Sequence, residues 1–199
     1  MVKLLVIRHG KTDWNLNNKI QGRTDIALSQ LGREELVGRR VPDEFSGFDW
    51  VASPLKRTQE TAELLGASDL KLEPALIEMS WGEWEGETLK VLHEKYGAEF
   101  RYNEARGLQM TPPGGESPAD VVERLQPWLK SLASDTIAVT HKGVIRAIKS
   151  LAYNWDMTDK APVSFDWATG HLFEVSATGD IRLKMNFRRA LVIAGQEGM

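Results

Sequence analysis

Arg8 and His9 stand directly after a short apolar run, residues 4–7, which has the length and composition of a buried strand. Gly10 follows and allows the chain to turn sharply as the strand ends. The pair would therefore lie at the carboxyl edge of a sheet, where open α/β folds place their ligand sites. An arginine offers a planar fork of donors suited to phosphate, and a histidine beside it could attack or donate. The alternative is a strand end with two solvated polar residues.

Two further junctions between a predicted strand and a predicted helix carry the same kinds of side chain. The alternating strand at residues 48–52 ends at a Ser-Pro pair, and Arg57 lies in the first turn of the helix that follows. The buried strand at residues 136–140 ends in His141. If these strands are parallel neighbours, their carboxyl ends converge on one crevice that holds two histidines and two arginines.

Glu78 follows a fourth predicted strand, residues 70–77, and adds a carboxyl group to this crevice. Two arginines and a helix N-terminus can hold a phosphoryl group. One imidazole can attack phosphorus and form a covalent intermediate, while the other donates to a phosphoryl oxygen in the transition state. The carboxylic acid can protonate the leaving oxygen and later activate water. The set therefore indicates phosphoryl transfer, with Glu83, Glu85 and Glu87 as nearby rivals for the acid.

Helical and extended segments elsewhere would position this crevice. Helices with Ser29, Ser53 and Ser117 as N-caps are predicted over residues 30–40, 53–66 and 117–132, and a fourth over residues 144–153. Two helical pieces, residues 88–96 and 99–106, are separated at Gly97, and residues 15–24 are predicted as a loop with room for a short turn of helix. Hairpin strands are predicted at residues 163–167, 170–175 and 181–187. Parallel βα units followed by hairpins predict an α/β fold of three layers, α/β/α, with a mostly parallel mixed central sheet.

Composition excludes several classes of protein. The 199 residues suffice for one α/β domain, and a net charge of −3 gives no sign of a nucleic-acid or membrane-surface partner. The absence of cysteine excludes disulfides, thiol nucleophiles and Cys-ligated zinc. No segment approaches the ~20 apolar residues of a membrane span, and the first residues lack the organisation of a signal peptide. We therefore expect a cytoplasmic protein; the sequence carries no signal for its oligomeric state.

The motifs and their order resemble the histidine phosphatase superfamily, whose members share the phosphoglycerate mutase-like fold. Six motifs, spread over most of the chain, match in the family's order: Arg8-His9-Gly10 with Thr12, Trp14 and Asn15; Gly22-Arg23-Thr24-Asp25 with Leu28, Ser29 and Gly32; Ser53-Pro54-Leu55 with Arg57, Thr61 and Ala62; Glu78 with Gly82, Trp84, Glu85 and Gly86; Pro113-Gly114-Gly115-Glu116-Ser117; and His141 with Gly143, Ile145 and Arg146. One such motif is weak, but six in order are a specific signal.

The resemblance implies a role for each catalytic residue. His9 would be the nucleophile that becomes phosphohistidine, and Glu78 would be the general acid and base. Arg8, Arg57 and His141 would surround the transferred phosphoryl group. The resemblance implies neither a metal nor a cofactor.

Substrate binding and domain organisation follow from the same resemblance. Asn15 would contribute an amide donor to the phosphoryl group, and Gly22, Arg23 and Thr24 would line the entrance and touch the substrate. Residues 1–199 would form a single histidine phosphatase domain, with residues 79–116 as a helical and loop insertion over the active site.

The segment at residues 93–117 bears on the choice between a phosphatase and a mutase. Cofactor-dependent phosphoglycerate mutases carry a longer insertion there, with paired arginines and a lysine that grip the carboxylate of the acid. Here the segment is short, and Arg101 and Arg106 are separate. Its Pro-Pro-Gly-Gly-Glu-Ser run resembles the small phosphatases, including broad-specificity and α-ribazole phosphatases. We therefore expect a phosphomonoester hydrolase that acts on a small anionic phosphorylated metabolite.

Three other functions stay open on the sequence. The chain could be a phosphoglycerate mutase that depends on 2,3-bisphosphoglycerate, or a catalytically silent module that binds a phosphate ligand. Two histidines and a glutamate could also ligate zinc, although Arg8 beside a metal would be electrostatically costly. Lys11 and Lys142 depart from the family's pattern; they either add positive charge near the rim or are solvated surface residues.

Overall fold

The central sheet has six strands in the order β4-β3-β5-β1-β6-β7. The computed structural model describes residues 1–164 and 169–193. The first four strands in that order are parallel, and β6 and β7 are antiparallel to β1 and to each other. The sheet is therefore mostly parallel and mixed, as predicted. Its strands are β1 (Val2–Arg8), β3 (Asp49–Ala52), β4 (Leu70–Leu72), β5 (Thr136–Thr140), β6 (Thr169–Val175) and β7 (Ile181–Ala190).

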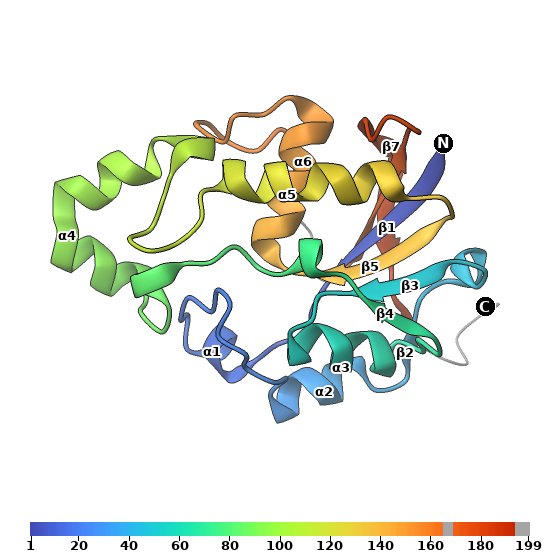
Figure 1. Cartoon of the computed structure of the whole chain (residues 1–199). Helices are drawn as coiled ribbons and strands as arrows, with labels where there is room; N and C mark the ends of the chain where they lie inside the picture. The colour runs from blue at the N-terminus through green and yellow to red at the C-terminus, as the bar shows by residue number, and fades with distance from the viewer. Residues whose placement is uncertain (165–168, 194–199) are drawn as a thin grey trace.

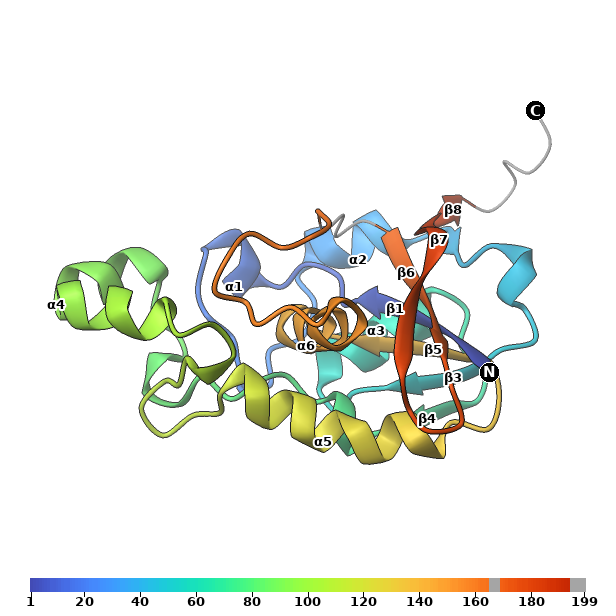
Figure 2. The same cartoon turned by 90° about the horizontal axis from the view of Figure 1, so that it is seen from above.

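Helices cover both faces of this sheet, which confirms the three predicted layers. The helices α2 (Gln30–Leu36) and α3 (Lys56–Leu64) lie on one face, and α5 (Pro118–Ser131) and α6 (Lys142–Tyr153) lie on the other (Figures 1 and 2). Alternate residues of β1 supply the two cores, because successive side chains of a strand point to opposite faces.

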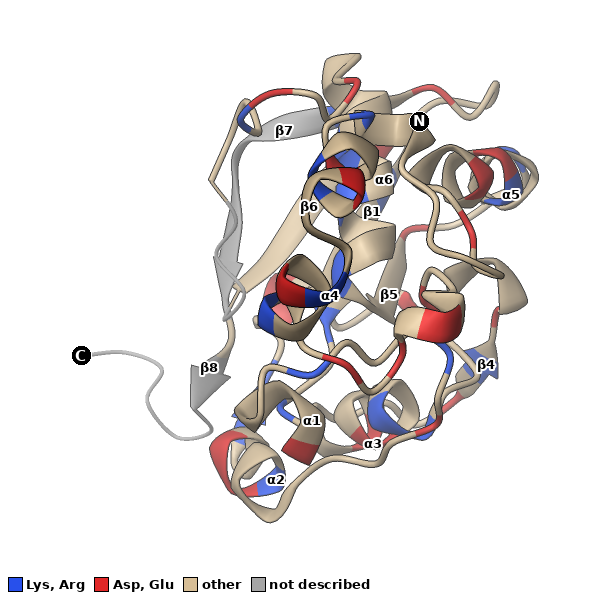
Figure 3. Cartoon of the chain, turned by 90° about the vertical axis from the view of Figure 1, so that its left-hand side faces the viewer, with Lys and Arg blue, Asp and Glu red and all other residues tan. Residues whose placement is uncertain are grey.

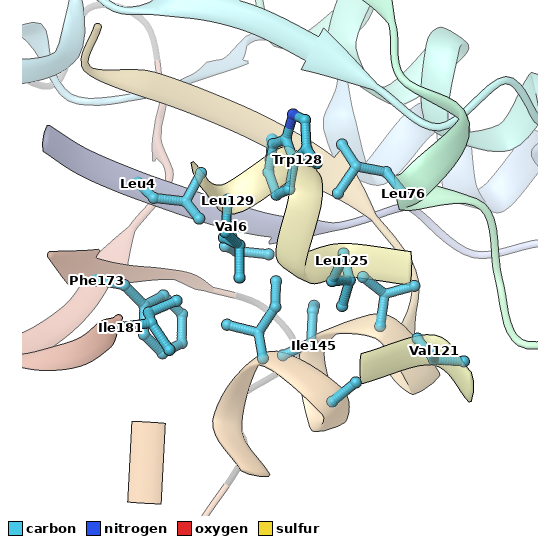
Figure 4. Close-up of a cluster of buried hydrophobic side chains, with 14 of the residues drawn as sticks. Leu4, Val6, Leu76, Val121, Leu125, Trp128, Leu129, Ile145, Phe173 and Ile181 are labelled. Atoms are coloured by element: carbon cyan, nitrogen blue, oxygen red, sulfur yellow. The ribbon is translucent and has the colours of Figure 1, made fainter. Parts of the chain in front are cut away.

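The core beneath α5 and α6 contains Leu4 and Val6 (Figure 4), whereas Leu5 and Ile7 pack toward α2 and α3. These four side chains of β1, at residues 4–7, are essentially inaccessible to solvent. This burial on both faces explains why the run at residues 4–7 is continuously apolar.

Residues 79–116 carry η3 (Gly82–Trp84), α4 (Leu89–Glu104) and η4 (Gly107–Gln109). Helix α4 lies away from the two helical layers, beyond one end of the sheet (Figure 1). It is broken at Gly97, whose φ of 53° and ψ of −116° are not helical, so two helical pieces form as predicted. A separate small core of Trp84, Leu92 and Phe100 holds this segment together.

Several helix boundaries differ from the prediction. The short turn of helix near the start of the loop forms α1 (Asp13–Leu16), which begins two residues before the predicted loop. Helix α2 ends at Leu36 rather than at residue 40, because the chain continues into β2 (Arg39–Arg40), which pairs with β8 (Val192–Ile193) and is followed by η1 (Asp43–Phe45). That pairing joins distant parts of the chain, so local sequence could not reveal it. Helix α6 begins at Lys142, two residues earlier than predicted, with His141 as its N-cap residue.

Ser29 and Ser117 cap their helices as predicted, but Ser53 does not. The N-cap residue of α3 is Leu55, with no side-chain hydrogen bond. Ser53 instead contacts His141.

The predicted strand at residues 70–77 is also wrong in its second half. Strand β4 ends at Leu72, because Pro74 lacks an N–H and begins η2 (Pro74–Leu76). Of the predicted strand at residues 163–167, positions 163 and 164 are not extended strand and 165–167 lie outside the described residues. None of the helices in the described part of the chain combines the length and apolar character needed to cross a bilayer.

Candidate active site

The carboxyl ends of β1 and β5 bring the two histidines together. The strands are parallel neighbours with Arg8 opposite Thr140, and the backbone N–H of His9 donates to the carbonyl of Thr140 at 3.0 Å. The ring centroids of His9 and His141 are therefore only 5.2 Å apart. Figure 3 looks onto this end of the molecule, with α4 in front and α1 and α3 below it.

His9 is poised as a neutral imidazole with one bare nitrogen. Its Nδ1 lies 2.6 Å from the carbonyl oxygen of Gly10, which can only accept, so Nδ1 carries the proton and Nε2 has the lone pair. Burial, together with the positive charges of Arg57 and Arg8, lowers the pKa of His9 well below its ordinary value. An unprotonated Nε2 near two guanidinium groups is suited to attack an anionic phosphorus centre.

Arg57 is completely buried and holds three neighbours at once. Its Nη1 and Nη2 atoms donate to the carbonyls of Thr24 and Gly22 at 2.9 and 2.7 Å, and its Nε donates to Nδ1 of His141 at 3.3 Å. A guanidinium has five N–H groups, so two remain for a ligand. Helix α3 supplies this residue from its first turn, as the sequence predicts.

The hydrogen bonds of His141 fix its tautomer. Because Arg57 can only donate, Nδ1 of His141 must be the bare nitrogen, and Nε2 carries the proton. Nε2 lies 2.8 Å from the hydroxyl of Ser53, which therefore accepts. Burial first, and then the charge of Arg57, lowers the pKa of His141 well below its ordinary value, which agrees with a neutral ring. A phosphoryl oxygen would have to compete with Ser53 for the Nε2 proton.

The contact between Ser53 and His141 was not predicted from the sequence. The position of Ser53 before Pro54 suggested a helix cap. Ser53 also follows the end of β3, which pairs with β5, the strand that ends at His141, and this position could have indicated a contact with His141. We expect Ser53→Ala to lower kcat by up to about tenfold with little change in KM. The variant removes a competing acceptor, but the His141 ring also loses the neutral hydrogen bond that holds its orientation, which contributes ~1 kcal/mol. Steady-state rates over a pH series, with ¹⁵N NMR of the His141 ring, measure the change.

Ser150→Ala is the matched control for this variant, since Ser150 is also buried but its hydroxyl donates to the carbonyl of Ala147 within α6. Restored activity in Ser53→Thr would support an effect through the hydroxyl. A Ser53→Ala protein with the wild-type kcat and an unchanged His141 spectrum would show that Ser53 does not position the ring.

Glu78 is the buried carboxyl group of the site. Its two oxygens accept from the backbone N–H groups of Met79 and Gly143 at 2.9 and 3.3 Å. Burial raises the pKa of Glu78, against the opposing effects of those N–H groups and of the arginines. A Cβ at position 143 would lie 2.4 Å from a Glu78 oxygen, so glycine is required for this approach.

Tertiary contacts rather than a strand bring Glu78 to the site. The Thr140 hydroxyl donates to the carbonyl of Leu76 at 2.7 Å and ties η2 to the end of β5. The rivals Glu83 and Glu87 are exposed, and Glu85 binds another loop. Of these four carboxylates, only Glu78 lines the cavity described below.

Asn15 lies on α1 with its amide orientation fixed. The backbone N–H of Thr12 donates to the Asn15 side chain at 3.1 Å, so the atom that accepts must be the oxygen Oδ1. This bond belongs to a capping box, and Asn15 also lines the cavity. The amide nitrogen Nδ2 is thus the group that Asn15 can offer to an anion.

The loop of Gly22, Arg23 and Thr24 is held by the carboxylate of Glu85. Glu85 accepts from the backbone N–H groups of Arg23 and Thr24, both at 2.9 Å, and from the Thr24 hydroxyl at 2.5 Å. The Arg23 guanidinium donates to Glu116 at 2.6 Å. Gly22 lines the cavity, but Arg23 and Thr24 do not, and the loop's carbonyls orient Arg57.

A cavity of about 1130 Å³ opens in front of these groups. Arg8, His9, Arg57 and Glu78 line it at the sheet edge, and His141 lies behind Arg57. Trp81, Trp84, Phe100 and Met110 of the segment at residues 79–116 form an apolar part of its wall. No group of three or more His, Asp or Glu side chains in the described residues is arranged to hold a metal ion.

A three-layer fold with two histidines, two arginines and a buried carboxyl group at one sheet edge places this chain among the α/β enzymes. The profile of the histidine phosphatase superfamily (branch 1) matches residues 4–185, and the chain belongs to that superfamily.

Individual relatives include both phosphatases and mutases. The chain is 29% identical to phosphoserine phosphatase 1 of Hydrogenobacter thermophilus, over 94% of this chain and 92% of that protein. It is 32% identical to the 2,3-bisphosphoglycerate-dependent phosphoglycerate mutase of Bartonella henselae, over 73% of this chain and 78% of that protein. A crystal structure of a Thermus thermophilus protein, 28% identical, superposes with a TM-score of 0.73 over 96% of this chain and all of that chain.

Proposed function

We propose that this enzyme hydrolyses phosphomonoesters of small anionic metabolites through a phosphohistidine intermediate. The observation that carries the proposal is the neutral His9, whose bare Nε2 faces a site with two arginines and a carboxyl group of raised pKa. Similarity to phosphatases, such as the phosphoserine phosphatase of Hydrogenobacter thermophilus, supports this reading.

The geometry supports a two-step reaction. Nε2 of His9 attacks phosphorus and forms a P–N bond, while the ester P–O bond breaks and protonated Glu78 gives its proton to the leaving oxygen. Glu78, now a carboxylate, takes a proton from water as that water attacks phosphorus. The P–N bond then breaks, which releases phosphate and restores neutral His9 and protonated Glu78. Arg8, Arg57, His141 and the Asn15 amide stabilise the charge on the transferred group.

A 2,3-bisphosphoglycerate-dependent mutase is the second candidate, because the mutase from Bartonella henselae is a comparably similar relative. Such an enzyme returns the phosphoryl group to its substrate, whereas a phosphatase must give it to water. The silent binding module would show no turnover at all.

A panel of phosphomonoesters, assayed for released phosphate with and without 2,3-bisphosphoglycerate, tests the proposal. We expect phosphate release equal to alcohol release, and less than about twofold stimulation by the bisphosphate. Strong stimulation with isomerised phosphoglycerate and little free phosphate would instead identify a mutase. Binding of vanadate without turnover of any ester would identify the silent module.

A further inference from the structure

The cavity is much larger than a phosphoryl group, so it has room for the rest of a substrate beside the phosphoryl site. That lining is rich in cations. The carboxylates in it are Glu35, Glu78 and Glu104. Lys11 pairs with Glu35 at 2.5 Å, and His93 lies 3.2 Å from Glu104.

Lys142 and Arg146 are the cavity cations nearest in sequence to His141, and both come from α6. Residues four apart on a helix lie on the same face, so their side chains are neighbours. The Arg146 guanidinium stacks over the ring of Trp155, 4.9 Å from its centroid, which restricts its position. A pre-positioned guanidinium beside a lysine suits recognition of a carboxylate or a phosphate.

Arg8, Arg146 and the carboxyl group of Glu78 all lie near Lys142. Burial first, and then the charges of Arg8 and Arg146, lower the pKa of Lys142, whereas Glu78 raises it by a smaller amount. The repulsion among these cations is a cost that a bound anion would offset. The charge of Arg8 will be shared with the transferred phosphoryl group. Of the other cations that line the cavity, Lys142 and Arg146 lie on the helix that begins directly after His141, which places them to meet a second anion.

We propose that Lys142 and Arg146 form a second anion subsite beside the phosphoryl site, so the substrate carries a carboxylate or a second phosphate on its leaving group. This inference rests on the proposed function for its turnover assay, although it can also be measured by binding alone. It assigns Lys142 to substrate recognition and Lys11 to an ion pair with Glu35.

Three substrates that differ only at the distal carbon test the subsite: glycerol 1-phosphate, 3-phosphoglycerate and glycerol 1,3-bisphosphate. We expect the two that bear a second anion to have kcat/KM values at least about tenfold higher than glycerol 1-phosphate, because only they can pair with Lys142 and Arg146. A tenfold preference corresponds to ~1.4 kcal/mol. Lys142→Met should reduce that preference severalfold. It should lower kcat/KM for 3-phosphoglycerate and glycerol 1,3-bisphosphate more than for glycerol 1-phosphate. The preference should also fall as salt is added.

Lys90→Met is the matched control, because Lys90 also lines the cavity but lies on α4, and it should keep the full preference. Arg146→Met should act like Lys142→Met; Lys142→Met decides the outcome if loss of the Trp155 contact unfolds the Arg146 variant. Equal kcat/KM values for the three esters, or an unchanged preference in Lys142→Met, would overturn the subsite.

Calorimetric binding of the same three esters to the His9→Asn variant separates the two proposals. If no ester is hydrolysed by the wild-type enzyme, the proposed hydrolase function fails. The subsite is still supported if 3-phosphoglycerate and the bisphosphate bind more tightly than glycerol 1-phosphate and Lys142→Met removes the difference. Equal affinities would overturn it, whatever the turnover assay shows.

Discussion

Replacing His9 with asparagine is expected to reduce kcat by about 10⁴-fold or more, the scale of loss when a covalent nucleophile is removed. Asparagine can keep a hydrogen bond to the backbone but has no basic nitrogen to attack phosphorus. Arg8 and Arg57, the phosphate ligands that we propose, remain, so substrate should still bind. Steady-state rates with p-nitrophenyl phosphate measure kcat. Acid-quenched trapping of ³²P on the protein, from a ³²P-labelled ester, measures formation of the phosphoenzyme. We expect acid-labile, base-stable label on the wild-type enzyme and none on the variant.

His93→Asn is the control for the loss of an imidazole, since His93 lies on α4 with a partly exposed side chain and pairs with Glu104. It should retain wild-type activity and wild-type labelling. An active His9→Asn enzyme, or one that still acquires label at the same rate, would remove His9 as the nucleophile.

Glu78→Gln is expected to lower kcat by about 10²- to 10⁴-fold for alkyl phosphates, the usual range for a positioned general acid. Glutamine preserves the shape of the side chain and can accept from the Met79 N–H group, but its NH2 group replaces the oxygen that accepts from Gly143, and it cannot deliver a proton. p-Nitrophenol leaves without much protonation, so its ester should lose less in the first step. The ratio of the two losses is the diagnostic measurement.

The pH dependence of this variant provides a second test. His9 must be neutral, and its pKa lies well below the ordinary value, so activity falls only as pH drops through that lowered pKa. Glu78 must start protonated, and burial raises its pKa, so activity falls as pH rises through that raised pKa. The wild-type profile should be bell-shaped, and Glu78→Gln should lose the alkaline limb.

Glu83→Gln is the control, since this nearby carboxylate is exposed and does not line the cavity. Its rate and pH profile should match those of the wild type. If Glu78→Gln keeps the alkaline limb, or loses equal activity on alkyl and nitrophenyl esters, another group supplies the proton.

Local sequence predicted the junctions at which the site lies. The buried run at residues 4–7, followed by Arg8 and His9, specifies a strand that ends in polar groups, and the segment ending at His141 repeats the pattern. Strand polarity then places both at one sheet edge. The same local reasoning failed at Ser53, since a serine before proline is equally suited to cap a helix or to bind across strands.

The sequence by itself thus determined the fold class, the residue types at the sheet edge and the family. Tertiary structure decided the proton positions on the two histidines, because these depend on partners such as the Gly10 carbonyl and Arg57. It also decided the difference between Lys11 and Lys142. Both follow a site histidine closely in sequence, but Lys11 pairs with Glu35 of α2, whereas Lys142 lines the cavity near Arg8, Arg146 and Glu78. Charge partners of this kind come from distant segments, so no local pattern specifies them.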